Sequence, residues 1–467
     1  MNENPDAVRE NLRYLRILGQ QYPTVEAAST EIIYQQAVLN LPKGTEHFMS
    51  DLHGEYEAFL HILNNASGAI KEKVDILYGN TLSSRERAVL ATLIYYPEAK
   101  LKEIHEELSE EELSEWYRIN LNRLMEICRL VASKYTRSKV REALPKGYEY
   151  IIDELLHTNY DALNKEQYYE NIIATIIEIG RGDAFVNSVC TTIKRLVVDR
   201  LHIVGDIFDR GPRPDIILDS LERHHRVDIQ WGNHDILWMG AAAGSRTCIA
   251  NVLNNSITYN NLEVIETGYG ISLRRLERFA QHTYADSDVS RWLPHADQRT
   301  AAGDLTAAAR MHKAVTVMML KLEAQVIARN PDFDLQGRDF LNHIDFAAGT
   351  VDYFGTTYPL LDCDFPTVDP AVPTVLTAEE AHIIAGLVRS FAESERLQRH
   401  VQFLYAHGAF YKICNGNLLY HGVVPMTRTG SFAVERFEGH PYSVRALMDY
   451  CDERARRGYF GPEGSAA

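Results

Sequence analysis

The sequence predicts an α/β protein in which the strands of a sheet are separated by long helical segments. Short apolar runs at 196–204 and 227–231 each end in glycine followed by aspartate, asparagine or histidine, as buried strands of such a sheet often do. The segments 83–96, 110–135 and 165–180 instead carry apolar residues at the 3.6-residue spacing of helices. The strands should therefore deliver their polar clusters to one edge of a sheet.

Composition and charge narrow the class of partner. The chain has 467 residues, of which 45% are hydrophobic and 24% charged, and its net charge is −16. So acidic a protein is not expected to bind nucleic acid or an anionic membrane, since both need clustered lysine and arginine. A site for an anionic phosphate ester would need local positive charge, which divalent metal ions and an arginine could supply.

Cysteine usage and the start of the chain predict a cytoplasmic protein. The six cysteines are scattered without a Cys-x-x-Cys pair, which favours free thiols in a reducing compartment. The polar, acidic stretch 1–6 is unlike a secretory leader. No apolar run approaches the roughly 20 residues that span a bilayer.

Six regions follow in order. Residues 1–45 form an N-terminal helical region with helices expected at 7–20 and 24–41. Residues 46–65 start the core, with a strand at 47–49 and a helix at 56–63. In the extended segment between them, Asp51 and His53 point the same way and could grip one ion.

Residues 66–194 are a helical insertion, because this stretch is too long for a simple connection. Ser109 and Glu112 predict a capping box at the start of its longest helix. The acidic run 103–115 is interpreted as a solvated helical face.

Residues 195–262 hold the central core, where Gly205-Asp206 and Gly232-Asn233 end two strands. A helix expected at 236–243 points its N-terminus, which favours anions, back at these clusters.

Two further regions complete the chain. Residues 263–400 are a second, mainly helical insertion with a long helix at 307–328 and a loop at 358–373. Residues 401–467 return to the core with strands at 401–411 and 417–420, a C-terminal helix and a truncated end. The second of these strands delivers His421 into a glycine turn, and 458–467 shows no periodicity.

Asp206 and Asp209 admit a purely structural interpretation, because Gly205-Asp206 and Gly211-Pro212 are good turn formers by themselves. Asp51-Leu52-His53 and Asn233-His234 argue against that interpretation. Together the three clusters form the ordered signature Asp-x-His, Gly-Asp-x-x-Asp-Arg-Gly, Gly-Asn-His-Asp.

This signature resembles that of the dinuclear metallophosphoesterases. The segments 49–56, 311–314 and 415–422 are more particular and resemble the class III fructose-1,6-bisphosphatases of bacteria, from about residue 11 to about residue 460. The resemblance implies a metallophosphatase core of two facing mixed β-sheets flanked by helices, with large helical insertions. It also implies hydrolysis of fructose 1,6-bisphosphate to fructose 6-phosphate and phosphate, a gluconeogenic step.

The resemblance assigns roles to the clustered residues. Two divalent ions, manganese or alternatively magnesium, would be held by Asp51, His53, Asp206, Asn233 and His421, with a bridging hydroxide attacking phosphorus. His234, paired with Asp209, would protonate the leaving oxygen. Arg210 would bind the phosphate and act in catalysis together with His234 and Asp209. Asn233 would also contact the substrate.

One departure from the family pattern concerns the second ion. Family members continue through a further Gly-His-x-Pro type motif that supplies another histidine ligand, and we do not find it in this sequence. His407 could substitute, but it is expected inside a strand rather than at its end. His202, His224, His225, His312 and His440 are expected to be structural or on the surface.

Three functions stay open at this point. The first is fructose-1,6-bisphosphatase activity, with a sugar bisphosphate as partner and with either a monomer or a homo-oligomer allowed. The second is another metallophosphoesterase activity, toward proteins or dinucleotide polyphosphates, which the long helical insertions disfavour. The third is a catalytically impaired remnant with a structural or regulatory role, and metal content would distinguish it.

Overall fold

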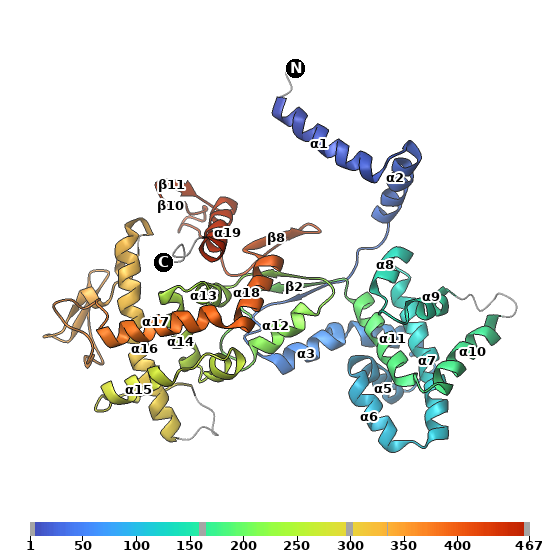
Figure 1. Ribbon diagram of the computed structural model, residues 1–467, viewed down its shortest axis with the longest axis horizontal. Helices are drawn as coiled ribbons and strands as arrows, with labels where there is room; N and C mark the ends of the chain where they lie inside the picture. Colours follow the sequence, from blue (N-terminus) through green and yellow to red (C-terminus); the bar gives the residue numbers. More distant parts are fainter. Residues whose placement is uncertain (1–4, 158–164, 296–301, 334, 462–467) are drawn as a thin grey trace. The chain divides into compact units, whose positions relative to one another are not determined.

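The computed structural model describes residues 5–157, 165–295, 302–333 and 335–461 (Figure 1). It is a mixed α/β structure in which helices predominate, so the α/β class predicted from the sequence is confirmed. The chain divides into two compact units, residues 1–46 with 64–199, and residues 47–63 with 200–467.

The first unit is built of helices. They are α1 (Pro5–Gln21), α2 (Val25–Leu39), η1 (Ala66–Gly68), α4 (Ala69–Tyr78), α5 (Ser84–Tyr95), α6 (Pro97–Glu107), α7 (Glu110–Ala132), α8 (Arg137–Ala143), α9 (Glu149–His157), α10 (Lys165–Glu178) and α11 (Gly182–Val197). Ser109 and Glu112 form the predicted capping box at the start of α7. The core of this unit includes Ile70, Leu121 and Phe185, all with fully buried side chains.

The central feature of the second unit is a four-stranded sheet in the order β1-β2-β3-β7. Its strands are β1 (Glu46–Met49), β2 (Arg200–Val204), β3 (Val227–Gln230) and β7 (Gly408–Ala409). Strands β2 and β3 pair in parallel with Leu201 opposite Val227, and β3 pairs in parallel with β7. Because neighbouring strands run the same way, their carboxyl ends lie at one edge of the sheet.

Helices surround this sheet in the second unit. They are α3 (Tyr56–Asn65), α12 (Pro214–Glu222), α13 (Asn233–Ala242), α14 (Arg246–Thr258), η2 (Val264–Gly268), α15 (Arg274–Thr283), η3 (Ser290–Trp292), α16 (Ala302–Arg329), η4 (Pro331–Phe333), η5 (Gln336–Arg338), η6 (Leu341–His343), α17 (Ala378–Glu393), α18 (Glu395–His407) and α19 (Arg445–Phe460). Ile203, Phe208, Ile229 and Trp238 belong to one buried core with residues from these helices.

Three small antiparallel sheets complete the unit. They are β4 (Ile344–Asp345), β5 (Thr350–Tyr353) and β6 (Thr356–Pro359); β8 (Tyr411–Cys414) and β9 (Asn417–Tyr420); and β10 (Glu435–Phe437) and β11 (His440–Tyr442). Tyr411 pairs with Tyr420 in the β8–β9 hairpin, so this hairpin ends immediately before His421.

Two predictions about secondary structure are wrong. Leu196 and Val197 end helix α11 instead of beginning a strand. Residues 401–407 belong to α18, and only Gly408 and Ala409 join the sheet there. Buried Val401, Leu404 and Tyr405 follow the spacing of a helix, and this pattern outweighs their strand-like composition.

The last described element of the chain is a helix. Helix α19 extends to Phe460, and the rest of the predicted irregular tail, 462–467, lies outside the described residues. No helix among the described residues combines the length and apolarity needed to cross a membrane.

Candidate metal and phosphate site

The loops that follow β1 and β2 are joined by backbone hydrogen bonds. The nitrogen of Asp51 donates to the carbonyl of Gly205 at 3.1 Å, and the nitrogen of His53 donates to that of Asp206 at 2.8 Å. The Asp-x-His and Gly-Asp clusters, far apart in the sequence, therefore lie side by side beyond the carboxyl ends of their strands.

The backbone of these loops is strained at the polar residues. Asp51, His53, Asp206, Asp209 and Arg210 all have positive φ, between 43° and 69°. Residues with a Cβ seldom adopt this region, and such strain concentrates at functional sites.

Asp206 lies at the centre of the site. Its Oδ2 atom is 3.2 Å from Nε2 of His421 and 3.8 Å from Nε2 of His53. On the other side, Oδ1 of Asp51 lies 3.8 Å from Nε2 of His53. Two groups that could hold an ion share Asp206: one contains Asp51 and His421, the other contains His53 and His234.

Both histidines are oriented toward Asp206 by contacts to the backbone. Nδ1 of His53 lies 3.1 Å from the carbonyl oxygen of Phe208, and Nδ1 of His421 lies 2.9 Å from that of Val204. A proton on each Nδ1 would donate to these carbonyls and leave Nε2 as the free lone pair that a metal requires. Gly205 makes room for this, because a Cβ there would meet Nδ1 of His421 at 2.5 Å.

The donor set fits a divalent cation. Nε2 of His53 is buried and has no hydrogen-bond partner among the described residues. Leaving such an atom unsatisfied costs free energy, and the space between it and the two carboxylates would let a cation satisfy it. Imidazole and carboxylate ligands suit manganese, zinc and iron.

Asn233 is the first residue of α13, and its side chain is exposed. It lines a cavity of about 530 Å³ together with His421. The other walls of this cavity are mainly apolar and include Trp231, Ile236 and Phe410. The structure thus places Asn233 beside a predicted ligand.

His234 and Asp209 form the predicted pair. Nδ1 of His234 lies 2.6 Å from Oδ2 of Asp209, whose side chain is fully buried. This hydrogen bond raises the pKa of His234 above its ordinary value, although burial of the ring opposes the shift. The contact also leaves Nε2 of His234 as the atom available to a substrate.

Arg210 is exposed at the same loop. Its guanidinium carbon lies 5.8 Å from the centre of the Tyr259 ring, a weak cation–π contact. The guanidinium is therefore exposed at the site, and its N–H groups have no protein acceptor among the described residues.

Asp235 is a residue of the site that sequence reasoning missed. Its buried carboxylate accepts hydrogen bonds from the backbone nitrogens of Asp206 at 2.9 Å, Ile207 at 2.8 Å and Gly232 at 2.9 Å. It thereby ties the loop after β2 to the loop after β3. Burial raises the pKa of Asp235 to about 6, while the backbone donors oppose this shift. The only sequence signal was its place three residues after Gly232, where helix N-termini often carry a carboxylate.

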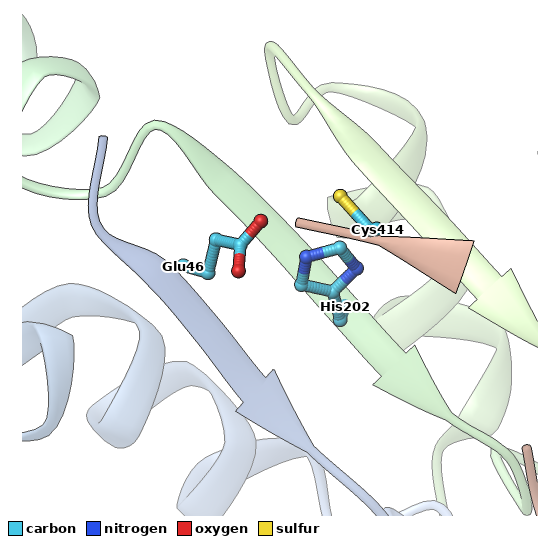
Figure 2. A group of neighbouring side chains, drawn as sticks. All are labelled: Glu46, His202 and Cys414. Carbon is cyan, nitrogen blue, oxygen red and sulfur yellow. The ribbon is translucent and has the colours of Figure 1, made fainter. Parts of the chain in front are cut away.

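Glu46, His202 and Cys414 form another group with potential metal ligands, whose ligand atoms lie within 4.8 Å of one another (Figure 2). Here, however, Nδ1 of His202 lies 2.6 Å from Asp228, and Arg200 donates to the sulfur of Cys414 at 3.3 Å. A guanidinium at the sulfur would compete with a cation, so we assign this group a structural role.

His407, the possible substitute ligand, lies at the end of α18. It is exposed, and its ring packs 4.6 Å from that of Phe403. It belongs to none of the ligand groups found among the described residues.

Comparisons with known proteins agree on one family. The family described as Firmicute fructose-1,6-bisphosphatase matches residues 13–467. Proteins named fructose-1,6-bisphosphatase class 3 from Clostridium novyi and Clostridioides difficile are each 50% identical to the chain, over 99% and 97% of its length. The chain covers 70% and 69% of these two relatives. No solved structure matches it.

Proposed function

Because this chain belongs to the class 3, or Firmicute, fructose-1,6-bisphosphatase family, we propose that it hydrolyses fructose 1,6-bisphosphate to fructose 6-phosphate and phosphate. The observation that carries the proposal is the approach of His53 and His421 to one oxygen of Asp206, beside the hydrogen-bonded His234–Asp209 pair. Such an arrangement suits attack on a phosphate ester at one side and protonation of the leaving oxygen at the other.

Five residues are proposed to hold two divalent ions. Asp51 and His53 would hold the first, Asp206 would contact both, and Asn233 and His421 would hold the second. We propose manganese, with magnesium as the alternative, since imidazole and carboxylate ligands suit manganese. When bound, the ions would neutralise phosphate charge and lower the pKa of a coordinated water.

The other proposed roles belong to residues beside these ligands. Arg210 would clamp phosphate oxygens through its planar guanidinium, and the exposure of its side chain supports this role. Asn233 lines the adjoining cavity and would also contact substrate. His234 would donate the proton on Nε2 to the leaving sugar oxygen, while Asp209 stabilises the imidazolium.

We also propose the finer architecture and the compartment. The four-stranded sheet and the β8–β9 hairpin would belong to the two facing sheets of a metallophosphatase core. The delivery of His421 by the hairpin onto Asp206, which follows β2, supports this interpretation. Scattered free cysteines support a cytoplasmic location.

The test is release of phosphate from fructose 1,6-bisphosphate by the purified chain with added manganese, together with enzymatic detection of fructose 6-phosphate. Phosphopeptides and dinucleotide polyphosphates serve as competing substrates. Activity on those substrates without activity on the sugar bisphosphate would overturn the assignment. Inactivity on every substrate, with one ion or none bound, would instead favour the catalytically impaired remnant.

A further inference from the structure

Helix α14 contacts two consecutive residues of the loop after β2. Nδ2 of Asn255 donates to Oδ2 of Asp209 at 3.1 Å, and the ring of Tyr259 lies beside the guanidinium of Arg210. Asn255 lies in the last turn of the helix, and Tyr259 is the residue that caps its C-terminal end.

Asp209 is held from three directions. Its Oδ2 atom accepts from His234 and Asn255, and its Oδ1 atom accepts from Nε1 of Trp238 at 2.8 Å. Asp209 itself lies in the left-handed region, with φ of 64°. Three donors from outside this loop therefore fix both oxygens of a buried carboxylate whose backbone is strained.

We propose that Asn255, with Trp238, is a positioning residue that fixes the Asp209 carboxylate and through it the His234 ring. This inference rests on the proposed function, in which His234 supplies a proton to the leaving oxygen. A carboxylate free to rotate would hold the imidazole in several orientations, and Nε2 would then less often face the leaving oxygen.

The contact made by Asn255 differs from those made by its neighbours on the same helix. Nδ2 of Asn254 donates to Oγ1 of Thr316 at 2.6 Å, and Nδ2 of Asn251 donates to Glu323 at 3.1 Å. Both bonds join α14 to α16, away from the site. Asn254 is therefore a matched control, because it is the same residue type on the same helix and is also partly buried.

Tyr259 extends the same support to the phosphate clamp. Its half-buried ring lies beside Arg210, where it would limit the directions that the long side chain can take. The C-terminal end of α14 and its cap thus contact both Asp209, the partner of His234, and Arg210, the proposed phosphate clamp.

The experiment compares Asn255→Ala, Asn255→Asp and Trp238→Phe with the control Asn254→Ala. On fructose 1,6-bisphosphate, we expect kcat of Asn255→Ala to fall about 10-fold, a fraction of the roughly 10²- to 10⁴-fold that a general acid contributes. Asn255→Asp should fall further, since it sets a second carboxylate against Asp209. KM and manganese content of Asn255→Ala should stay near wild type. The control Asn254→Ala should keep the wild-type rate.

Two further readouts separate positioning from a merely structural role. p-Nitrophenyl phosphate releases a stable phenolate that hardly needs a proton, so its hydrolysis should be spared in Asn255→Ala. In ¹⁵N NMR spectra recorded at a pH at which the imidazoles are neutral, and assigned with His234→Gln, wild type should show His234 protonated on Nδ1, and Asn255→Ala should show a mixture of tautomers.

Several results would overturn the inference. They are an Asn255→Ala protein that behaves like Asn254→Ala, an equal loss on both substrates, or a His234 spectrum unchanged by the substitution. Wild type inactive on fructose 1,6-bisphosphate would instead count against the proposed function, and the NMR comparison would then decide on the positioning role alone.

Discussion

Nε2 of His421 lies 3.2 Å from Oδ2 of Asp206, although His421 follows strand β9 and Asp206 follows strand β2. The β8–β9 hairpin therefore places a proposed ligand atom beside a site otherwise built at the edge of the four-stranded sheet. The same Asp206 oxygen lies 3.8 Å from His53. One carboxylate consequently serves both ligand groups.

Asp206→Asn should abolish hydrolysis and remove most bound manganese, because one lost negative charge weakens both ion positions. Metal analysis after dialysis and circular dichroism check this, and the helical signal should persist. Asp228→Asn is a suitable control, since Asp228 is also a buried aspartate paired with a histidine, His202. A mutant of Asp206 that keeps two tight ions and near-native turnover would contradict the assignment.

Asp209→Asn and His234→Gln should each lower kcat by roughly 10²- to 10⁴-fold, since both disable the same proton donor. The double variant should be scarcely slower than either single variant, because residues that act as a unit lose their effect together. Steady-state kinetics of all four proteins measure this. Losses that multiply in the double variant would mean that the two residues act independently.

Arg210→Lys should reduce kcat/KM about a hundredfold, or roughly 3 kcal/mol, because a point charge cannot replace an oriented guanidinium. Its melting temperature should hardly change, since the side chain is exposed. The control is Arg213→Lys, which breaks a two-pronged contact with buried Asp215 at 2.9 and 3.0 Å and should mainly lower stability. If Arg210→Lys lost stability and rate in parallel, Arg210 would be structural.

The structure brings together most of the residues that the sequence predicts as a site, because these residues follow a pattern of chemistry and spacing. Asp51, His53 and Asp206 lie directly after strands, so their place at one sheet edge could be inferred from local sequence alone. The role of Asp235 could not, since it accepts hydrogen bonds from backbone atoms of a loop that no side-chain spacing reveals. The contact of Asn255 with Asp209 depends on how helices pack, which is a property of the folded chain.

The misread secondary structure has a simpler physical origin. Val401, Leu404 and Tyr405 are β-branched, aliphatic and aromatic, a composition common in strands. Their i, i+3, i+4 spacing nevertheless places them on one buried face of α18. Periodicity was the better guide there, because burial of one helical face outweighs the preferences of single residues.

Asp219 offers a test of stability against pH. Burial opposes its ionisation, but hydrogen bonds from Arg396 and His400 prevail and hold the pKa of Asp219 below its ordinary 3.8. A pKa lowered by folding stabilises the protein above pH 3.8, and the benefit is lost as pH falls through the lowered value. Asp219→Asn should therefore cost roughly 2 kcal/mol at neutral pH, as for hydrogen bonds to a charged group.

Urea denaturation at pH 7 and at about pH 3 measures this difference. The gap in unfolding free energy between wild type and Asp219→Asn should narrow at the lower pH. Arg399 and His400 also face this carboxylate, so the Asp219 contribution is tested through the difference between proteins and not through the pH curve of either one. A gap that stays constant would show that the ionised form is not what stabilises the fold.

The two proposed ions should bind manganese with different strength. In the proposed ligand sets, the first position would combine the carboxylates of Asp51 and Asp206 with His53. The second would combine Asp206 with His421 and the neutral amide of Asn233. Fewer negatively charged ligands predict an affinity lower by roughly 10- to 100-fold at the second position. Calorimetric titration should show one tighter and one weaker site, and turnover should rise only as the weaker site fills.

His407→Ala should leave both sites unchanged, because this residue is exposed and its ring packs on Phe403. Two equally tight sites, with the second lost in His407→Ala, would show instead that His407 completes the second ligand set.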